Sequence, residues 1–482
     1  MSVHQSERGG TLWVAVERAA QQLFWLVLFV ILAPILGPRA YGQFALVMVF
    51  IGFCELILIE AAVEALVSLD VAARGHVGTA TLVNAAVALV VGAAAWLLAE
   101  PFARAFDDPE LVTIAHAMAP LPLISALTAA PIGMLRRDRA FRPLALRSII
   151  GLASGAVVGI AAALSGHGVW ALVLQTLVQR TVELGILWAA QPSAIALGWS
   201  RAHWGDMAHF ARNVTVSRAM YWMAGQAPRL VIGYLLGPVA LGLFTLAGRA
   251  SDVLLQIVVL PRTIVARIEL IGDRAEPVRF EARLRAMTRE TALFAFPTAI
   301  GAAAVMPQLF ALWLDHRWFD GLAATQLMLL SAIPLLGFFA CTAGLMAANR
   351  PDLEARVSVW QSVSNTLVTL ATAWFGLTAV TAAMLVRLVA LLPLAVRQLS
   401  SAASIRAVTL VEGTLPILIA ATIMGVVTYA TDLYVPLPAS AALQLALLVV
   451  EGVALYLAAL FVIDRSLVGL LIKQTLTIVK RG

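Results

Sequence analysis

A segment of eleven residues occurs twice in this chain, two hundred residues apart. The copies cover 36–46 and 236–246, and Leu, Gly, Pro, Ala, Gly, Phe and Leu recur at the same seven positions. Apolar bias explains the matching Leu and Ala residues, but it does not explain Gly-Pro, the second Gly and Phe in register. Each copy lies between two long apolar runs. A repeat of this kind indicates an internally duplicated chain, which is typical of membrane transporters.

The composition indicates that a lipid bilayer is the solvent of this chain. The 482 residues are 61% hydrophobic and 12% charged, whereas a soluble domain carries about 25% charged residues. The apolar runs are continuous and lack the alternation of barrel strands, so they predict helical spans of about 20 residues each. We expect an all-α polytopic membrane protein with about fourteen transmembrane helices. The expected spans centre on 11–36, 42–66, 77–99, 111–134, 146–164, 169–190, 213–236, 240–262, 291–314, 321–347, 355–375, 378–396, 411–430 and 440–463.

The distribution of Lys and Arg predicts which face of the membrane each loop occupies. With the N-terminus in the cytoplasm, 24 of the 33 cations fall in cytoplasmic loops or tails and three fall in outer loops. This asymmetry follows the positive-inside rule and predicts that both termini are cytoplasmic. The same count assigns Arg147 to a cytoplasmic loop. The net charge of +6 is therefore a property of the loops, and no nucleic-acid partner is expected.

The position of the repeat predicts the domain organisation. Six spans separate its copies, and an even number returns the chain to the same face, so the halves are expected to be parallel repeats. The expected domains are a six-helix bundle at 1–200, a second six-helix bundle at 201–408, and two further helices with a cytoplasmic tail at 409–482. Within each copy, Gly is expected to end a helix and Pro to prevent its continuation.

Six arginines remain within or near the spans. Arg180 has Glu183 at i+3, so we expect a structural ion pair there. Charge inside a bilayer is costly and tends to face a bundle interior or a wet cavity. The remaining arginines are candidate contacts for an anionic substrate, because guanidinium groups bind phosphate bidentately. These candidates are Arg18, Arg218, Arg229, Arg249 and Arg387.

Each of these candidates has a second interpretation. Arg249 has Asp252 at i+3, which favours an ion pair, and Arg218 and Arg387 are placed so that they can extend towards an interface. Arg229 is the leading candidate because it follows Pro228, whose missing N–H is expected to break the helix.

Carboxylates in the spans are candidate sites for a coupling proton or cation. Glu60 and Glu64 share a helix face at i, i+4, and like charges at that spacing favour holding a proton; Glu55 and Asp252 complete the set. The alternative is that these carboxylates pair with the span arginines. No catalytic residue, metal site or cofactor is expected, since the seven His form no HExxH or Cys/His cluster.

Several segments, taken in order, resemble one family. They are the hairpin repeat, Arg-Arg-Asp-Arg-Ala-Phe-Arg at 136–142, Gly-His-Gly-Val-Trp-Ala-Leu at 166–172 and Leu-Val-Ile-Gly-Tyr-Leu-Leu-Gly-Pro at 230–238. From about residue 11 to residue 400, the chain resembles the polysaccharide exporters of the multidrug/oligosaccharidyl-lipid/polysaccharide (MOP) superfamily, which include the O-antigen and colanic-acid flippases. The resemblance implies two six-helix bundles in a V shape that work by alternating access. It implies translocation of undecaprenyl-pyrophosphate-linked oligosaccharide across the bacterial inner membrane for surface polysaccharide biosynthesis.

The resemblance also implies partners and an alternative. The partners are the lipid-linked oligosaccharide, membrane lipids, and glycosyltransferases or a polymerase of the same pathway. The alternative function is a multidrug or cation antiporter of the related MATE branch, which usually needs cavity acids and typically has twelve spans. Family members commonly carry a polar pair of the Asp-Asn or Asn-Asp kind before the Leu-x-Ile-Gly stretch, where this chain has Pro228 and Arg229. A membrane glycosyltransferase is disfavoured because the outer loops are short, so a transporter and not an enzyme is expected.

Overall fold

The computed structural model is described over most of the chain. It covers residues 3–55, 59, 61–69, 73–194, 198–260, 262, 269–406, 409–435, 440–471 and 474. The chain forms two compact units, unit 1 (Met1–Gly242) and unit 2 (Leu243–Gly482), each of which is treated by itself. The predicted domain boundaries near residues 200 and 408 stay predictions.

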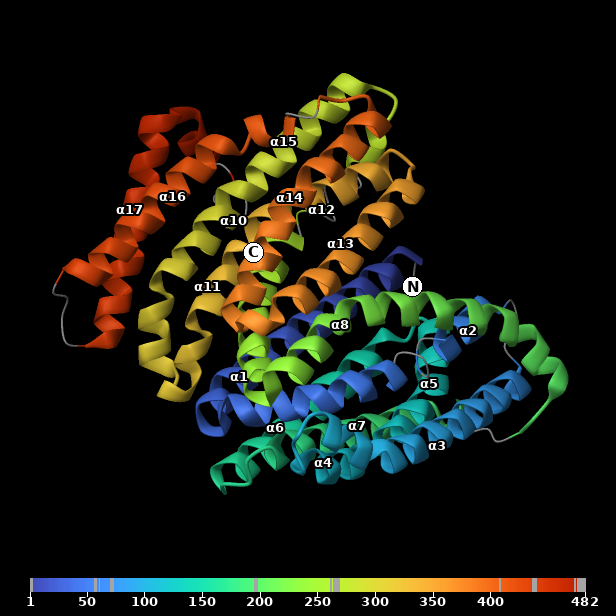
Figure 1. The fold of residues 1–482 in the computed structure, drawn as a ribbon. Coiled ribbons are helices and arrows are strands. Elements are labelled where there is room, and N and C mark those ends of the chain that lie inside the picture. The colour runs from blue at the N-terminus through green and yellow to red at the C-terminus, as the bar shows by residue number, and fades with distance from the viewer. Residues whose placement is uncertain are drawn as a thin grey trace. The chain divides into compact units, whose positions relative to one another are not determined.

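Unit 1 is helical throughout its described part (Figure 1). Its helices are α1 (Val3–Glu55), α2 (Ala61–Ser68), α3 (Arg74–Ala105), α4 (Glu110–Met118), α5 (Leu121–Arg137), α6 (Phe141–Leu164), α7 (Trp170–Ala190), the 3-10 turn η2 (Pro192–Ala194) and most of α8 (Arg201–Leu254). Helices α6 and α7 pack along their length, α1 lies against α6, and α5 contacts α2, α3 and α7.

Unit 2 begins with the end of α8 and is also helical in the residues described. Its elements are the π-helical turn η3 (Leu255–Val259), α10 (Pro277–Trp313), η4 (His316–Gly321), α11 (Leu322–Leu330), α12 (Ala332–Ala347), α13 (Pro351–Thr372), η5 (Ala373–Phe375), α14 (Leu377–Ala403), α15 (Thr409–Glu412), α16 (Leu415–Tyr434) and α17 (Ala441–Ile463). Helix α10 packs against α12, α16 and α17, and α14 packs against α12 and α13. A buried apolar cluster that includes Phe280, Phe338 and Leu399 joins α10, α12, α13 and α14.

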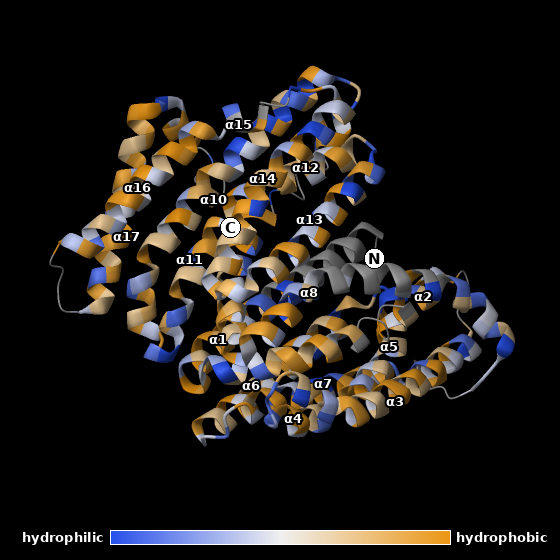
Figure 2. Cartoon of the chain, in the orientation of Figure 1, coloured by the Kyte–Doolittle hydropathy of each residue, from blue (hydrophilic) through white to orange (hydrophobic). Residues whose placement is uncertain are grey.

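The surface of these helices is that of a membrane protein. Ten helices in the described part of the chain are long and apolar enough to cross a bilayer. Hydrophobic residues run along most of each helix, and hydrophilic residues gather near the helix ends (Figure 2). Large side chains such as Leu97 on α3 and Val462 on α17 are 75% and 84% exposed, which is expected where lipid is the solvent. The all-α membrane fold is confirmed, whereas the number of fourteen spans stays a prediction.

The order of elements repeats along the chain. In the first repeat the kinked helix α1 precedes the long helix α3, and α4 and α5, of 9 and 17 residues, follow as a broken helix. In the second repeat the kinked helix α8 precedes the long helix α10, and α11 and α12, of 9 and 16 residues, follow as a broken helix. Left-handed residues recur at matching junctions, with Arg139 before α6 and Asn349 before α13, and with Gly168 before α7 and Gly376 before α14. This order supports the internal duplication.

The hairpin motif bends the backbone at its glycine, as predicted. Gly37 has φ 76° and ψ 171°, and Gly237 has φ 83° and ψ 177°, so each interrupts an otherwise continuous helix. An L-residue with a Cβ rarely adopts this conformation, so glycine is needed at both places. The following Pro38 and Pro238 start the next helical stretch, where a missing N–H has no consequence.

The second glycine of each copy permits a reciprocal crossing of the two hairpins within unit 1. A Cβ added at Gly42 would lie 1.6 Å from the carbonyl oxygen of Pro238, and one added at Gly242 would lie 1.8 Å from the carbonyl oxygen of Pro38. Each copy therefore presents the same glycine to the same carbonyl of the other, as in an isologous contact. This close backbone approach explains why Gly recurs in register in both copies.

We predict that Gly42→Ala and Gly242→Ala each destabilise the protein by about 1–3 kcal/mol or more, because the methyl group meets a backbone carbonyl that cannot rotate away. The measurement is the thermal unfolding midpoint of the protein purified in detergent. Gly248→Ala is the matched control, since its Cβ would meet nothing within 4 Å and Ala is favoured over Gly in a helix by about 0.5–1 kcal/mol. Equal midpoints for all three variants would contradict the crossing.

Candidate functional site

The structure describes the side chains of four of the five candidate arginines. Arg18 on α1 and Arg229 on α8 belong to unit 1, whereas Arg249 on α8 and Arg387 on α14 belong to unit 2. Arg18 and Arg249 are exposed, and Arg229 and Arg387 are half-buried. The side chain of Arg218 lies outside the described residues. Burial therefore distinguishes Arg229 in unit 1 and Arg387 in unit 2 from the two exposed candidates.

Arg387 is held by the neighbouring helix α13. Its Nη1 donates to the carbonyl oxygen of Gln361 at 3.1 Å and to Oγ of Ser364 at 3.2 Å. Its Nε is buried and has no hydrogen-bond partner among the described residues. A buried, unpaired donor of a charged group is costly. The arrangement therefore orients a cation inside a candidate membrane span by two neutral contacts.

Arg229 lies on an unbroken stretch of helix. The expectation that Pro228 breaks the helix is wrong, because the non-helical residue inside α8 is Gly237 and α8 continues through Pro228. Proline removes one N–H donor, but neighbouring helices allow a spanning helix to tolerate that loss. The Nη1 atom of Arg229 donates to Oε1 of Gln226 at 2.7 Å, one turn earlier.

The candidate coupling carboxylates are described in part. Glu64 on α2 is half-buried and makes no hydrogen bond or ion pair with another described residue, and Asp252 on α8 is exposed. The side chains of Glu55 and Glu60 lie outside the described residues, so the i, i+4 pair of Glu60 and Glu64 stays a prediction. Within the described ranges, no group of three His, Cys, Asp or Glu side chains is placed to hold a metal ion.

A buried carboxylate on α7 organises an ion-pair network that the sequence reveals only in part. Glu183 is 4% exposed and accepts from Nε2 of Gln179 at 2.9 Å and from Nη1 of Arg180 at 3.3 Å. The predicted Arg180–Glu183 pair is therefore confirmed. Nη1 of Arg147, on α6, lies 3.9 Å from the same carboxylate. The pair is enclosed, with side-chain exposures of 14% for Arg147 and 5% for Glu183.

The network continues from α6 to α1. Oγ of Ser148 donates to Oε1 of Glu17 at 2.8 Å and accepts from Nε2 of Gln21 at 3.0 Å. Two carboxylates and two guanidinium groups thus balance their charge among three helices, and Nε of Arg147 has no hydrogen-bond partner among the described residues. We call this group the polar cluster; its members are Glu17, Gln21, Arg147, Ser148, Gln179, Arg180 and Glu183.

Small residues on α6 bring α7 close enough to form the polar cluster. A Cβ at Gly151 would lie 2.5 Å from Cγ of Glu183, and one at Gly155 would lie 2.6 Å from the carbonyl oxygen of Gln175. Glycines spaced by four residues commonly let helix backbones approach each other in membranes. The sequence signal for the cluster was therefore the spacing of Arg147, Gly151, Gly155 and Gly159 on one face.

The assignment of Arg147 to a cytoplasmic loop is wrong. The residue lies in the second turn of α6, with its side chain directed to the buried Glu183. Its proximity in sequence to the loop arginines at 136–142 hid this role. A count of charges does not distinguish a positively charged loop from a buried cation five residues after it.

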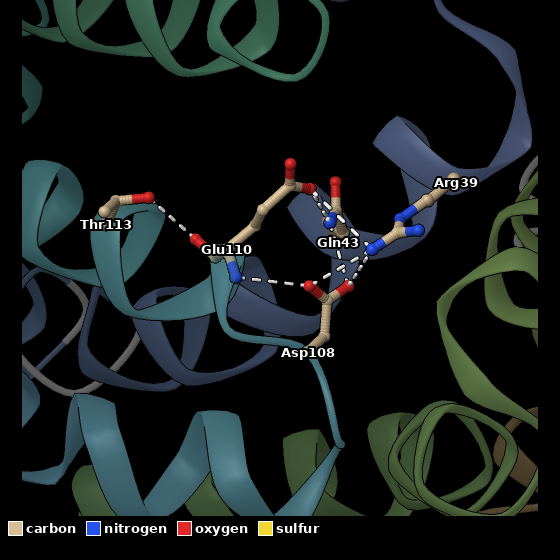
Figure 3. A network of polar contacts seen from close by, with 5 residues as sticks. All are labelled: Arg39, Gln43, Asp108, Glu110 and Thr113. Carbon is tan, nitrogen blue, oxygen red and sulfur yellow. Dashed lines mark hydrogen bonds and ion pairs between the residues drawn. The ribbon is translucent and has the colours of Figure 1, made fainter.

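A second polar network fixes the first hairpin to the α3–α4 junction (Figure 3). Nε2 of Gln43 donates to Oδ2 of Asp108 at 2.8 Å and to Oε2 of Glu110 at 2.6 Å. Arg39 adds an ion pair with Asp108 at 3.4 Å, and Gln43 and Asp108 are only 2% and 3% exposed. Asp108 is therefore a buried acceptor that positions the hairpin.

The second hairpin makes the corresponding contact with apolar groups in unit 2. Positions 39 and 43 of the first copy correspond to Val239 and Leu243 of the second. A Cβ at Gly321, before α11, would lie 3.0 Å from Cδ2 of Leu243. The duplicated hairpins thus meet the same kind of helix junction with different side-chain chemistry.

The chain is similar to known proteins in sequence and in structure. The family described as "Polysaccharide biosynthesis protein" matches residues 31–322. The chain is 25% identical over 322 residues to the succinoglycan biosynthesis transport protein ExoT of Rhizobium meliloti (strain 1021), covering 66% of this chain and 62% of that protein. The chain therefore matches less than two thirds of the length of this curated relative.

Solved structures share the fold. The lipid II flippase MurJ, in an inward closed conformation, aligns with a TM-score of 0.73 and 13% identity, over 95% of this chain and 99% of MurJ. An inward-facing multidrug resistance transporter of the MATE family, in the MOP superfamily, aligns with a TM-score of 0.57 and 14% identity, over 80% and 98% of the two chains. At these identities the likeness shows a common transporter fold.

For the polar cluster we predict that Glu183→Gln destabilises the protein by about 3–5 kcal/mol, because it leaves Arg147 buried without a counter-charge. The double variant Arg147→Met/Glu183→Gln should recover part of that loss, giving a measurable coupling energy. Thermal unfolding midpoints in detergent provide the readout. Glu100→Gln is the control, since the Glu100–Arg104 pair is over 70% exposed and such pairs contribute little. Additive effects of the two cluster substitutions would show that these side chains do not form a pair.

Proposed function

Because this chain belongs to the polysaccharide biosynthesis protein family, we propose that it is a flippase that moves a lipid-linked oligosaccharide across the membrane. The proposed substrate is undecaprenyl-pyrophosphate-linked oligosaccharide, carried from the inner to the outer leaflet of the bacterial inner membrane for surface polysaccharide biosynthesis. The similarity to a succinoglycan transport protein and the fold shared with a lipid II flippase support this proposal.

The observation that carries the proposal is the state of Arg387. This cation lies in a candidate membrane span, is oriented by two neutral contacts from α13, and has no carboxylate partner among the described residues. Charge at such a position is costly unless an anion or water compensates it. A pyrophosphate offers several acceptor oxygens to a guanidinium group. We therefore propose Arg387 as a substrate contact, together with Arg18, Arg218, Arg229 and Arg249.

The transport cycle follows from the different solvents that the substrate needs. The pyrophosphate requires cations, the sugar requires water, and the polyprenyl tail is soluble in lipid. A binding site that is open sideways to the bilayer satisfies all three, and alternating access then exposes the site to each leaflet in turn. Glu55, Glu60, Glu64 and Asp252 are proposed as sites for a coupling proton or cation.

We also propose that both termini are cytoplasmic and that enzymes of the same pathway are partners. Both termini are placed in the cytoplasm because the loop cations predict it. Glycosyltransferases or a polymerase of the same pathway would supply or consume the lipid-linked glycan. The alternative, a multidrug or cation antiporter, is less supported, since the family match and the curated relative are both polysaccharide proteins.

We predict that Arg387→Ala reduces export of lipid-linked glycan about 10–100-fold, the loss expected for one charged hydrogen-bonding contact of about 1.5–3 kcal/mol. Arg387→Lys should restore export only in part, because an ammonium lacks the planar fork. The measurement is surface polysaccharide in cells that depend on this protein, normalised to its level in the membrane. Arg104→Ala is the control, because the side chain of Arg104 is 71% exposed and Arg104 is not one of the candidate binding residues. Full export by Arg387→Ala at a normal protein level would remove Arg387 from the site.

A further inference from the structure

Unit 2 encloses a cavity of about 630 Å³ that the proposed transport site does not use. It lies between α10, α12, α14 and the segment from α15 to the start of α16. Its lining is apolar except for Thr288 and Thr414, and their hydroxyl groups donate to the carbonyl oxygens of Leu284 and Leu410, one turn earlier. A water molecule needs two to four polar partners, so this cavity is a poor site for water.

The walls of the cavity are accessible from outside the unit. Val389 on α14 is 56% exposed and Leu415 at the start of α16 is 47% exposed, and both line the cavity. Both helices are candidate membrane spans, so lipid is the medium in contact with this opening. An empty apolar space of this size forfeits packing energy. A hydrocarbon chain of a membrane lipid is therefore the ligand chemistry that suits this cavity.

Two polar residues follow the cavity-lining residues on α14. Arg397 lies one turn beyond the lining residue Pro393, is exposed, and makes no hydrogen bond or ion pair with another described residue. Ser400 lies one turn beyond the lining residue Val396, and its Oγ is buried without a hydrogen-bond partner among the described residues. Residues four apart share a helix face. A cation and a hydroxyl group are thus placed beyond one end of an apolar cavity.

The neighbouring charges leave Arg397 as the available cation. Glu412 on α15 pairs with both Arg285 and Arg406, and Oε2 of Glu281 accepts from the backbone N–H of Arg406 at 3.4 Å. None of these contacts involves Arg397. An exposed cation that is not neutralised by a carboxylate favours an anionic headgroup over a neutral one.

We propose that this cavity binds one acyl chain of an anionic phospholipid, whose phosphate contacts the exposed Arg397. In the orientation that the loop charges predict, α10 begins and α14 ends at the cytoplasmic face, so the lipid comes from the cytoplasmic leaflet. The lining of α10 extends from Thr288 to Phe296, a rise of about 12 Å at 1.5 Å per residue. That height suits the upper part of an acyl chain and is short for a polyprenyl carrier. None of the lining residues is a candidate contact of the proposed transport site, so the two sites are argued from different residues.

Native mass spectrometry of the full-length protein in detergent tests the proposal, because its readout is retained lipid and not transport. The probes are dioleoyl phosphatidylglycerol, dioleoyl phosphatidylethanolamine and undecaprenyl phosphate. The unsubstituted protein should retain one phosphatidylglycerol with at least tenfold preference over phosphatidylethanolamine. Val396→Trp, which fills the cavity, should lower that retention at least tenfold. Val386→Trp, on the same helix at a position 67% exposed and outside the cavity lining, should not change it.

A second pair of variants keeps the test decisive if Val396→Trp fails to fold. Arg397→Gln should weaken phosphatidylglycerol binding about fivefold, the effect of one cation at a charged surface, and exposed Arg274→Gln should leave it unchanged. Equal retention of the two phospholipids, or unchanged retention in Arg397→Gln, would overturn the proposal. Displacement of phosphatidylglycerol by equimolar undecaprenyl phosphate would overturn it too, since the cavity would then belong to the carrier lipid.

Discussion

A lipid bilayer offers no hydrogen bonds to the polar groups of a spanning helix, so every such group must find its partner inside the protein. The polar cluster shows the consequence in unit 1. Glu183 is buried against Gln179, Arg180 and Arg147, and the glycines of α6 let α7 approach closely enough for these contacts. Arg387 in unit 2 is the informative contrast, because its contacts from Gln361 and Ser364 are neutral, whereas Arg147 lies beside the carboxylate of Glu183. A buried cation that is paired with a carboxylate has a structural role, and one whose described partners are all neutral favours an anionic ligand.

The duplicated hairpin shows which features of a membrane fold are fixed by the backbone. Its first glycine adopts a left-handed conformation in both copies, and its second glycine permits each copy to cross the other at a proline carbonyl. Side-chain chemistry around the copies has diverged. Gln43 bonds to the buried Asp108 in unit 1, whereas Leu243 packs against Gly321 in unit 2. The backbone crossing requires glycine at these positions, whereas the side-chain contacts of the hairpins can be polar or apolar.

Features that depend on local pattern were predictable from the sequence. The apolar runs predicted helical spans, the Gly-Pro pair predicted the bends, and the i, i+3 spacing predicted the Arg180–Glu183 pair. Contacts between distant segments were not predictable, because no local spacing encodes them. Arg147 belongs to a buried pair 36 residues apart in sequence, although its arginine-rich neighbours indicated a loop. Pro228 was expected to break a helix that in fact continues, since propensity alone does not include the support of neighbouring helices.

The central claim is that arginines in the spans recognise the pyrophosphate of a lipid carrier. The most direct measurement is the affinity of the purified protein for undecaprenyl pyrophosphate compared with undecaprenol, which has the same tail and no charge. We expect the pyrophosphate to bind at least tenfold more tightly than undecaprenol, and this preference to fall as ionic strength rises. Equal affinity for the two lipids would contradict it, because binding would then depend on the tail and not on the cations.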